Sequence, residues 1–88
     1  MSVIVSTIHS NGTSKKELFN GYTAAISAVN KAIEAVRVTA PNARDYYVQE
    51  DDRAFEKARG EFEARLKALA FVHGELMEIA VTIHHLEA

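Results

Sequence analysis

Residues 52–86 read DRAFEKARGEFEARLKALAFVHGELMEIAVTIHHL, and this stretch decides the fold because its apolar residues recur at steps of three or four. Such a period places them on one face of an α-helix. Their average spacing is about 3.5 residues, which is typical of a coiled-coil seam. We therefore predict a long helix over residues 52–86, with Asp51 or Asp52 at its N-cap. The predicted core face comprises Phe55, Ala58, Phe62, Leu66 with Leu69, Val72, Leu76, Ile79, Ile83 and Leu86.

A second apolar period precedes this helix and predicts another helix over residues 15–39. Pro41 ends it, because the proline ring disfavours helical backbone at Ala40. At about 1.5 Å per residue, the two helices would be roughly 37 and 50 Å long. Residues 40–51 form the connecting loop. The predicted fold is all-α, an antiparallel two-helix hairpin in which the longer helix extends beyond the shorter. The apolar positions of the first helix are Leu18, Tyr22, Ile26, Val29, Ile33 and Val36.

The hairpin carries more apolar surface than it can bury, because each of its helices covers only one stripe of the other. Residues 1–13 are predicted to form a short extended arm, whose strand-like residues 3–8 have no second strand to pair with. Gly60 and Gly74 lie inside the second helix, where each costs about 1 kcal/mol relative to alanine. They are either tolerated there or mark the approach of a neighbouring backbone. We predict an oligomeric helical bundle, a homodimer or a higher homo-oligomer.

Composition limits the classes of function. The 88 residues form one domain, residues 1–88, and a net charge of −2 argues against a nucleic-acid partner. The absence of cysteine excludes disulfides and thiolate metal sites. We see no apolar stretch of the roughly 20 residues that span a bilayer and no basic-flanked leader, so we expect a cytoplasmic protein without a membrane partner.

No residue pattern indicates catalysis. His73 and His84 are eleven residues apart, which is about 16 Å along a helix and too far for one metal ion. The neighbouring His85 would point to a different face. No Ser-His-Asp order or paired buried carboxylates are recognisable. We therefore expect a protein that is not an enzyme and holds no metal or cofactor.

The stretch HSNGTSKKE, residues 9–17, allows two interpretations. Ser14 and Glu17 have the spacing of a capping box at the start of a helix. The same stretch places hydroxyl groups and a glycine before a helix N-terminus, which suits a phosphate or carboxylate ligand. In the second interpretation the ligand-binding residues are Ser10, Asn11, Gly12, Thr13, Ser14 and Lys15.

The loop PNARDYYVQEDD, residues 41–52, is the second candidate site. It is richer in functional groups than a connector between helices needs. Arg44 can bind a phosphate or carboxylate with its fork of N–H groups, and Tyr46 and Tyr47 offer stacking faces. The candidate ligand residues here are Arg44, Asp45, Tyr46 and Tyr47. The structural alternative is that Asp45 pairs with an arginine while the tyrosines cover the end of the core.

The order of HSNGTS, an amphipathic helix, PNARDYY and a long helix resembles a group of short proteins encoded by bacterial phages and prophages. This resemblance implies a helical hairpin in the cytoplasm of a bacterial host cell, with no settled activity. Small phage proteins of this size include oligomeric sponges for cyclic-nucleotide or ADP-ribose-type immune signals. By that analogy we expect a non-enzymatic protein that sequesters a small phosphorylated nucleotide at inter-subunit sites. The alternative is a helical adaptor or inhibitor that binds a host or virion protein.

The hairpin also predicts where the two motifs lie. Counting back from the loop places HSNGTS beside Leu76, about 35 Å from PNARDYY. A single small ligand cannot reach both motifs of one chain. Two chains packed head to tail would bring the loop of one beside the first helix of the other, with two equivalent composite sites.

Overall fold

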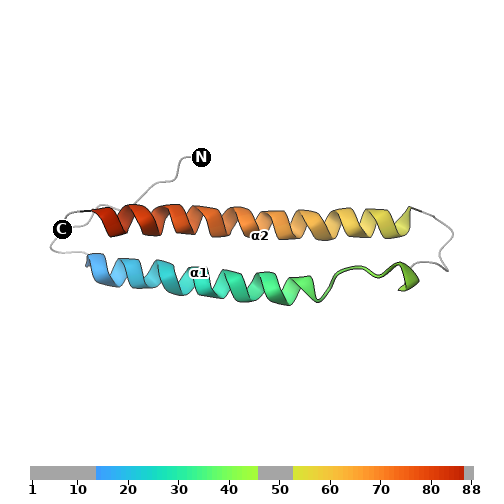
Figure 1. The fold of residues 1–88 in the computed structure, drawn as a ribbon, viewed down its shortest axis with the longest axis horizontal. Helices are drawn as coiled ribbons and strands as arrows, with labels where there is room; N and C mark the ends of the chain where they lie inside the picture. Colours follow the sequence, from blue (N-terminus) through green and yellow to red (C-terminus); the bar gives the residue numbers. More distant parts are fainter. Residues whose placement is uncertain (1–13, 46–52, 87–88) are drawn as a thin grey trace.

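The computed structural model describes residues 14–45 and 53–86, and its two long helices run antiparallel (Figure 1). Helix α1 spans Lys15–Arg37, a short 3-10 helix η1 spans Ala43–Asp45, and helix α2 spans Ala54–His85. No strand occurs within the described ranges. The molecule is thin, with extents of 63 × 22 × 18 Å. The all-α hairpin is confirmed, and the expected arm at residues 1–13 lies outside the described residues.

Helix α1 begins where the sequence places its cap. Ser14 has an extended backbone with φ −66° and ψ 157°. Its Oγ accepts a hydrogen bond from the backbone N–H of Glu17 at 3.1 Å. This bond satisfies one of the N–H groups that the first turn of a helix leaves without a partner. The predicted cap at Ser14 is confirmed.

Helix α1 ends at Arg37, slightly before the predicted end at residue 39. The backbone N–H groups of Thr39 and Ala40 donate to the carbonyls of Val36 and Arg37, at 2.9 and 3.2 Å. The Thr39 hydroxyl donates to the same Val36 carbonyl at 2.7 Å. These tight-turn bonds use the free carbonyls at the end of the helix before Pro41 is reached.

The pairing of the two helices differs from the prediction. Lys15 lies beside Leu86, because its Nζ donates a hydrogen bond to the Leu86 carbonyl at 2.7 Å. The prediction that the HSNGTS stretch lies beside Leu76 is therefore wrong, because the observed neighbour is ten residues further along α2. The reason is that residues 38–45 continue alongside the first turns of α2 instead of turning back at once (Figure 1). Pro41 accordingly lines a groove with Ala58. The predicted overhang of the longer helix is thus flanked by this segment.

The seam between the helices is narrow. Among the described residues only Phe62, Ala80 and Ile83 are buried. The prediction that Val72 belongs to the core face is wrong, because Val72 is 42% exposed. The half-buried His73 lies there instead. Alternating steps of four and three, as in a heptad repeat, give the seam of α2: Phe62, Leu66, Leu69, His73, Leu76, Ala80 and Ile83.

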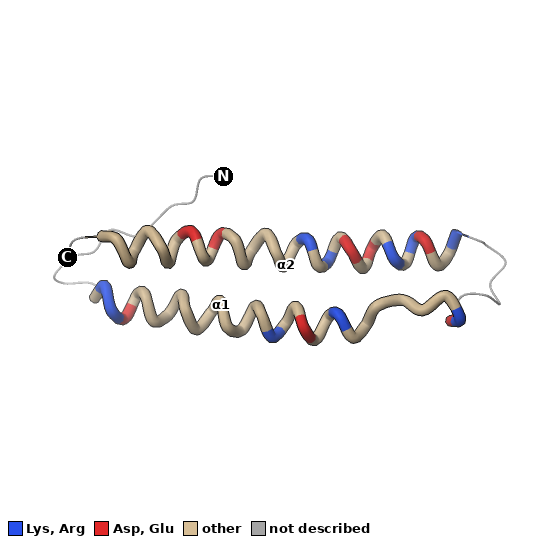
Figure 2. The backbone as a smooth tube through the Cα atoms, in the orientation of Figure 1, with Lys and Arg blue, Asp and Glu red and all other residues tan. Residues whose placement is uncertain are grey.

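Charge divides the hairpin into two halves (Figure 2). The terminal end comprises residues 14–30 and 68–86, and the loop end comprises residues 31–45 and 53–67. Residues 18–30, 68–74 and 79–86 contain no Asp, Glu, Lys or Arg, whereas charged side chains of both signs line the loop end. Neither described helix is long and apolar enough to cross a membrane.

Candidate functional site

The first predicted motif is only partly described, since residues 10–13 lie outside the described ranges. Its described members, Ser14 and Lys15, both make bonds within the chain. The Ser14 hydroxyl accepts the N–H of Glu17, and the Lys15 ammonium caps the last turn of α2 at Leu86. A cation at a helix C-terminus also interacts favourably with the helix dipole. The Lys15 bond therefore links the start of α1 to the end of α2, whereas the Ser14 bond is local to the first turn of α1.

The second predicted motif begins in η1. Asn42 starts a turn in which its Oδ1 accepts the backbone N–H of Arg44 at 3.0 Å. Its carbonyl accepts the N–H of Asp45 at 2.9 Å. The side chains of Arg44 and Asp45 are exposed. Residues 46 and 47, the two tyrosines of the prediction, lie outside the described residues. The turn thus leaves the Arg44 guanidinium facing solvent.

The described parts of the two motifs lie at opposite ends of the hairpin (Figure 1). Helix α1, which separates them, has 23 residues, or about 35 Å at 1.5 Å per residue. One chain therefore does not bring Lys15 and Arg44 to the same small ligand, as the sequence predicted.

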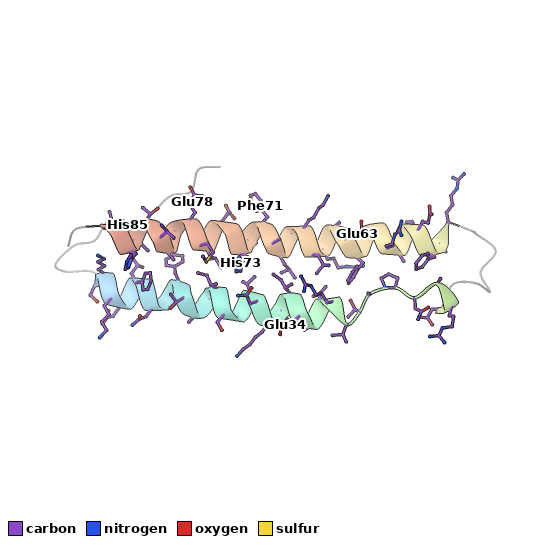
Figure 3. The ribbon with its side chains drawn as sticks, in the orientation of Figure 1. Glu34, Glu63, Phe71, His73, Glu78 and His85 are labelled. Atoms are coloured by element: carbon purple, nitrogen blue, oxygen red, sulfur yellow. The ribbon has the colours of Figure 1, made fainter. Side chains whose placement is uncertain are left out.

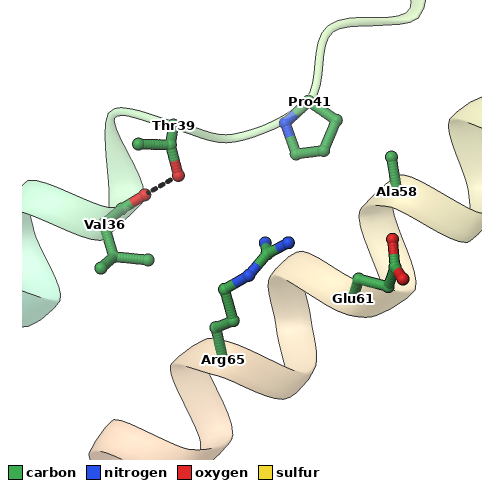
Figure 4. Close-up of a pocket in the computed structure, with 6 residues that line it drawn as sticks. All are labelled: Val36, Thr39, Pro41, Ala58, Glu61 and Arg65. Carbon is green, nitrogen blue, oxygen red and sulfur yellow. Dashed lines mark hydrogen bonds between the residues drawn. The ribbon is translucent and has the colours of Figure 1, made fainter.

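A groove opens at the loop end, where the extended segment runs beside α2 (Figure 4). Its volume is about 410 Å³, within the range of about 300 to 1,000 Å³ that is usual for ligand pockets. The extended segment and α1 supply one wall, and α2 supplies the other. The lining residues are Val36, Thr39, Pro41, Ala58, Glu61 and Arg65.

Arg65 is the cation of this groove. Figure 4 shows its guanidinium between the two walls, facing Thr39 and Pro41. The guanidinium has no hydrogen bond or ion pair with any described residue. Glu61 lies one helical turn before Arg65 and supplies the carboxylate of the groove. The Thr39 hydroxyl already donates its hydrogen bond to the Val36 carbonyl. The groove therefore offers one exposed arginine that has no partner among the described residues, between walls that carry both apolar and polar side chains.

Arg65 was not among the candidate site residues predicted from the sequence. In the sequence it is one of several charged residues on a helix, and nothing distinguishes it from Lys67 or Arg59. The spacing of seven residues between Ala58 and Arg65 places them on one face of the helix. That signal marks a common face, but only the course of residues 38–45 makes the face a groove.

The described histidines, His73, His84 and His85, lie in the second half of α2. His73 points toward α1 within the seam (Figure 3). The ring of His84 lies 5.5 Å from that of Phe19 and 5.4 Å from that of His85, measured between centroids. No group of three His, Cys, Asp or Glu side chains within the described ranges is arranged to hold a metal ion.

Comparison with protein-family models, with curated proteins and with solved structures finds no match to this chain.

Proposed function

We propose that the protein is a non-enzymatic binding protein that sequesters a small phosphorylated ligand of the nucleotide type, anchored at Arg65 in the groove of the loop end. The observation that carries this proposal is the Arg65 guanidinium, which has no partner among the described residues and lies over a groove of ligand size. An arginine fork binds phosphate with paired, charge-assisted hydrogen bonds.

The walls of the groove suit the other part of such a ligand. Val36, Pro41 and Ala58 supply apolar surface on both sides. A nucleotide combines a charged phosphate with a flat, weakly polar base, so its base would lie on these walls while Arg65 holds the phosphate. Arg44 follows Pro41 by only three residues and adds a second exposed cation at this end.

The loop residues predicted from the sequence and a homo-oligomer are both compatible with a ligand in this groove. Arg44, Tyr46 and Tyr47 would complete the site from the loop. Ser14 and Lys15, the described residues of the first motif, lie at the opposite end of the hairpin. They would contribute only from another copy of the chain, in a homodimer or higher homo-oligomer. The analogy in size with phage sponge proteins is the reason for proposing the capture of a nucleotide immune signal in the bacterial cytoplasm.

Titration calorimetry tests the ligand. Cyclic dinucleotides, cyclic trinucleotides and ADP-ribose isomers are titrated into the full chain. We expect Arg65→Ala to weaken binding about tenfold or more, because it removes a charge-assisted contact. Lys67→Ala is the matched control, because it removes a cation two residues away on the same helix. Absence of binding at millimolar ligand, or equal effects of the two substitutions, overturns the proposal.

Two further variants separate phosphate recognition from general charge. Arg65→Lys keeps the charge but loses the planar fork, so it should restore only part of the affinity. Glu61→Gln removes the carboxylate that lines the groove and would repel a phosphate there. We expect it to tighten binding, and weaker binding would mean that Glu61 contacts the ligand directly and that the phosphate is placed wrongly.

One observation favours a second function, a helical adaptor or inhibitor of a host or virion protein. Phe71 is 56% exposed and points away from α1 (Figure 3). An exposed aromatic residue of this kind is a typical anchor in a protein interface. If this function is correct, Phe71→Asp abolishes capture of one stoichiometric partner from a bacterial lysate, whereas Arg65→Ala leaves capture intact. The opposite pattern supports the nucleotide site.

A further inference from the structure

The groove at the loop end holds one cation and one anion. Of its lining residues only Arg65 and Glu61 are charged, and both are exposed. They are four residues apart on α2, about 6 Å along the helix, and therefore lie on the same wall. No ion pair joins these two described residues. A phosphate held by Arg65 is thus placed beside a carboxylate that no described cation neutralises.

The groove also has few hydrogen-bond donors. Thr39 donates its hydroxyl to the Val36 carbonyl at 2.7 Å and its backbone N–H to the same carbonyl at 2.9 Å. Pro41 has no N–H group, and the Glu61 carboxylate only accepts. The backbone N–H groups of the lining residues on α1 and α2 are bonded within these helices. The Arg65 fork is therefore the one free donor group among the described residues that line this groove.

Phosphate esters differ in their charge and in the number of oxygens that are not bonded to carbon. A phosphodiester carries one negative charge, as each phosphate of DNA does. A phosphomonoester carries about −1.5 to −2 at pH 7 and has three acceptor oxygens. An arginine fork donates two parallel N–H bonds, which match the two free oxygens of a phosphodiester. The third oxygen of a monoester and its second charge find no donor in this groove.

The second charge of a monoester is not compensated by electrostatic attraction. Its attraction to Arg65 grows with the charge, but its repulsion from Glu61 grows in the same proportion. The cost of removing water from the second charge remains. Val36 and Pro41 on the opposite wall offer no hydrogen bond in exchange for that water. The groove therefore suits an ester with one charge better than an ester with two.

The neighbouring cations of the loop end do not alter this balance. Lys57 lies one turn before Glu61 but does not line the groove, and it is about 12 Å from Arg65 along α2. Arg44 is exposed in η1 and is not a lining residue either. Arg44 is therefore available to a second phosphate of a larger ligand, whereas the phosphate at Arg65 lies beside Glu61.

We propose that this groove selects singly charged phosphodiesters over doubly charged phosphomonoesters, and that Glu61 is the residue that determines this specificity. The ligand class is then a nucleotide whose phosphate closes a ring or joins two nucleosides. The selection rests on the proposed function, because it requires a phosphate at Arg65. Glu61 supplies the repulsive element by which a binding site rejects the wrong ligand, here a nucleotide with a terminal phosphate.

A matched pair of nucleotides tests the selection. Adenosine 3′,5′-cyclic monophosphate and adenosine 5′-monophosphate share base, sugar and phosphorus, but the first is a diester and the second a monoester. Each is titrated into the full chain at neutral pH up to millimolar concentration, while NMR follows the signal of the Arg65 Nε–H group. We expect the cyclic nucleotide to bind several-fold more tightly and to shift this signal. Equal affinity, or tighter binding of the monoester, overturns the proposal.

Substitutions at Glu61 assign the selection to its carboxylate. Glu61→Gln should tighten binding of the monoester several-fold and that of the cyclic nucleotide less, because the repulsion depends on the ligand's charge. Glu61→Lys adds a second cation and should reverse the preference. Glu63→Gln is the matched control, since it removes a carboxylate about 200° away around the same helix. If Glu61→Gln and Glu63→Gln act alike, or if Glu61→Gln tightens both ligands equally, Glu61 does not determine the specificity.

The selection and the proposed function fail in different ways. If both nucleotides bind equally and Arg65→Ala weakens both, the phosphate site stands and the selection is wrong. If neither nucleotide shifts the Arg65 signal, the selection is also wrong. The proposed function fails only if Arg65→Ala leaves binding of the larger cyclic ligands unaffected as well. Positions 61, 63 and 65 are exposed, so all variants should fold, and thermal melts confirm this.

Discussion

The two ends of the hairpin are built in different ways. At the terminal end the helices contact each other directly, with Ile83 fully buried and Lys15 bonded to Leu86. At the loop end an extended segment replaces α1 beside α2, and a groove remains between them. The terminal end has few charged residues, Lys15, Lys16, Glu17, Glu75 and Glu78, whereas the loop end is rich in them (Figure 2). The terminal end holds two of the three buried side chains among the described residues, Ala80 and Ile83, whereas the loop end holds Phe62 and the groove.

The largest expected effect is a loss of stability at the terminal end. Ile83→Ala should lower the free energy of unfolding by about 2 to 5 kcal/mol, because the side chain is fully buried. Leu66→Ala, at the loop end, should cost less because Leu66 is only half-buried. Urea unfolding of both variants at one protein concentration measures the difference. If Leu66→Ala costs more, stability is not concentrated at the terminal end.

The next effect concerns the cap of α1. Ser14→Ala should lower the free energy of unfolding by about 1 kcal/mol, because the N–H of Glu17 loses its acceptor. Ser27→Ala is the control, since Ser27 is exposed in the middle of α1 and alanine is the better helix former there. Thermal unfolding distinguishes them. If Ser14→Ala causes no loss, the cap bond does not contribute to the terminal end.

A smaller effect, opposite in sign, is expected at Gly21. A methyl group there would meet no described atom within 4 Å. Gly21→Ala should therefore raise the free energy of unfolding by up to about 1 kcal/mol through helix propensity alone. Urea unfolding measures the gain. A destabilised Gly21→Ala variant would reveal a close neighbour on a side of the terminal end that we consider open.

The smallest effect on stability is expected at Arg44. Its backbone N–H makes the turn bond to Asn42, and its exposed guanidinium faces solvent. Arg44→Ala should change the free energy of unfolding by less than about 0.5 kcal/mol. It should also weaken binding of the proposed phosphorylated ligand. Asn42→Ala, which removes the acceptor of the turn bond, is the control and should cost more. Thermal melts in which Arg44→Ala destabilises as much as Leu66→Ala would assign Arg44 a structural role.

The seam shows how far an apolar pattern can be followed in a sequence. The steps of three and four located Phe62, Leu66, Leu76 and Ile83 correctly. The pattern failed at Val72, because the true seam position is the polar His73 and a search for apolar residues passes over it. A neutral histidine presents an apolar body with a polar tip, so it can occupy a half-buried seam position.

The sequence by itself determined the local structure of this protein. The period of its apolar residues gave two helices, the spacing of Ser14 and Glu17 gave the cap, and Pro41 limited α1. Each of these depends on residues within about one helical turn of each other, where backbone hydrogen bonding and steric exclusion act directly.

Only the tertiary structure decided the register of the hairpin and the presence of the groove. Lys15 pairs with Leu86, and Arg65 faces Pro41, because residues 38–45 run along α2 before the chain turns. Sliding one helix along another by whole turns preserves its apolar stripe, so the stripe alone does not fix the register. The path of the connecting segment fixes it, and with it the residues that meet across the hairpin.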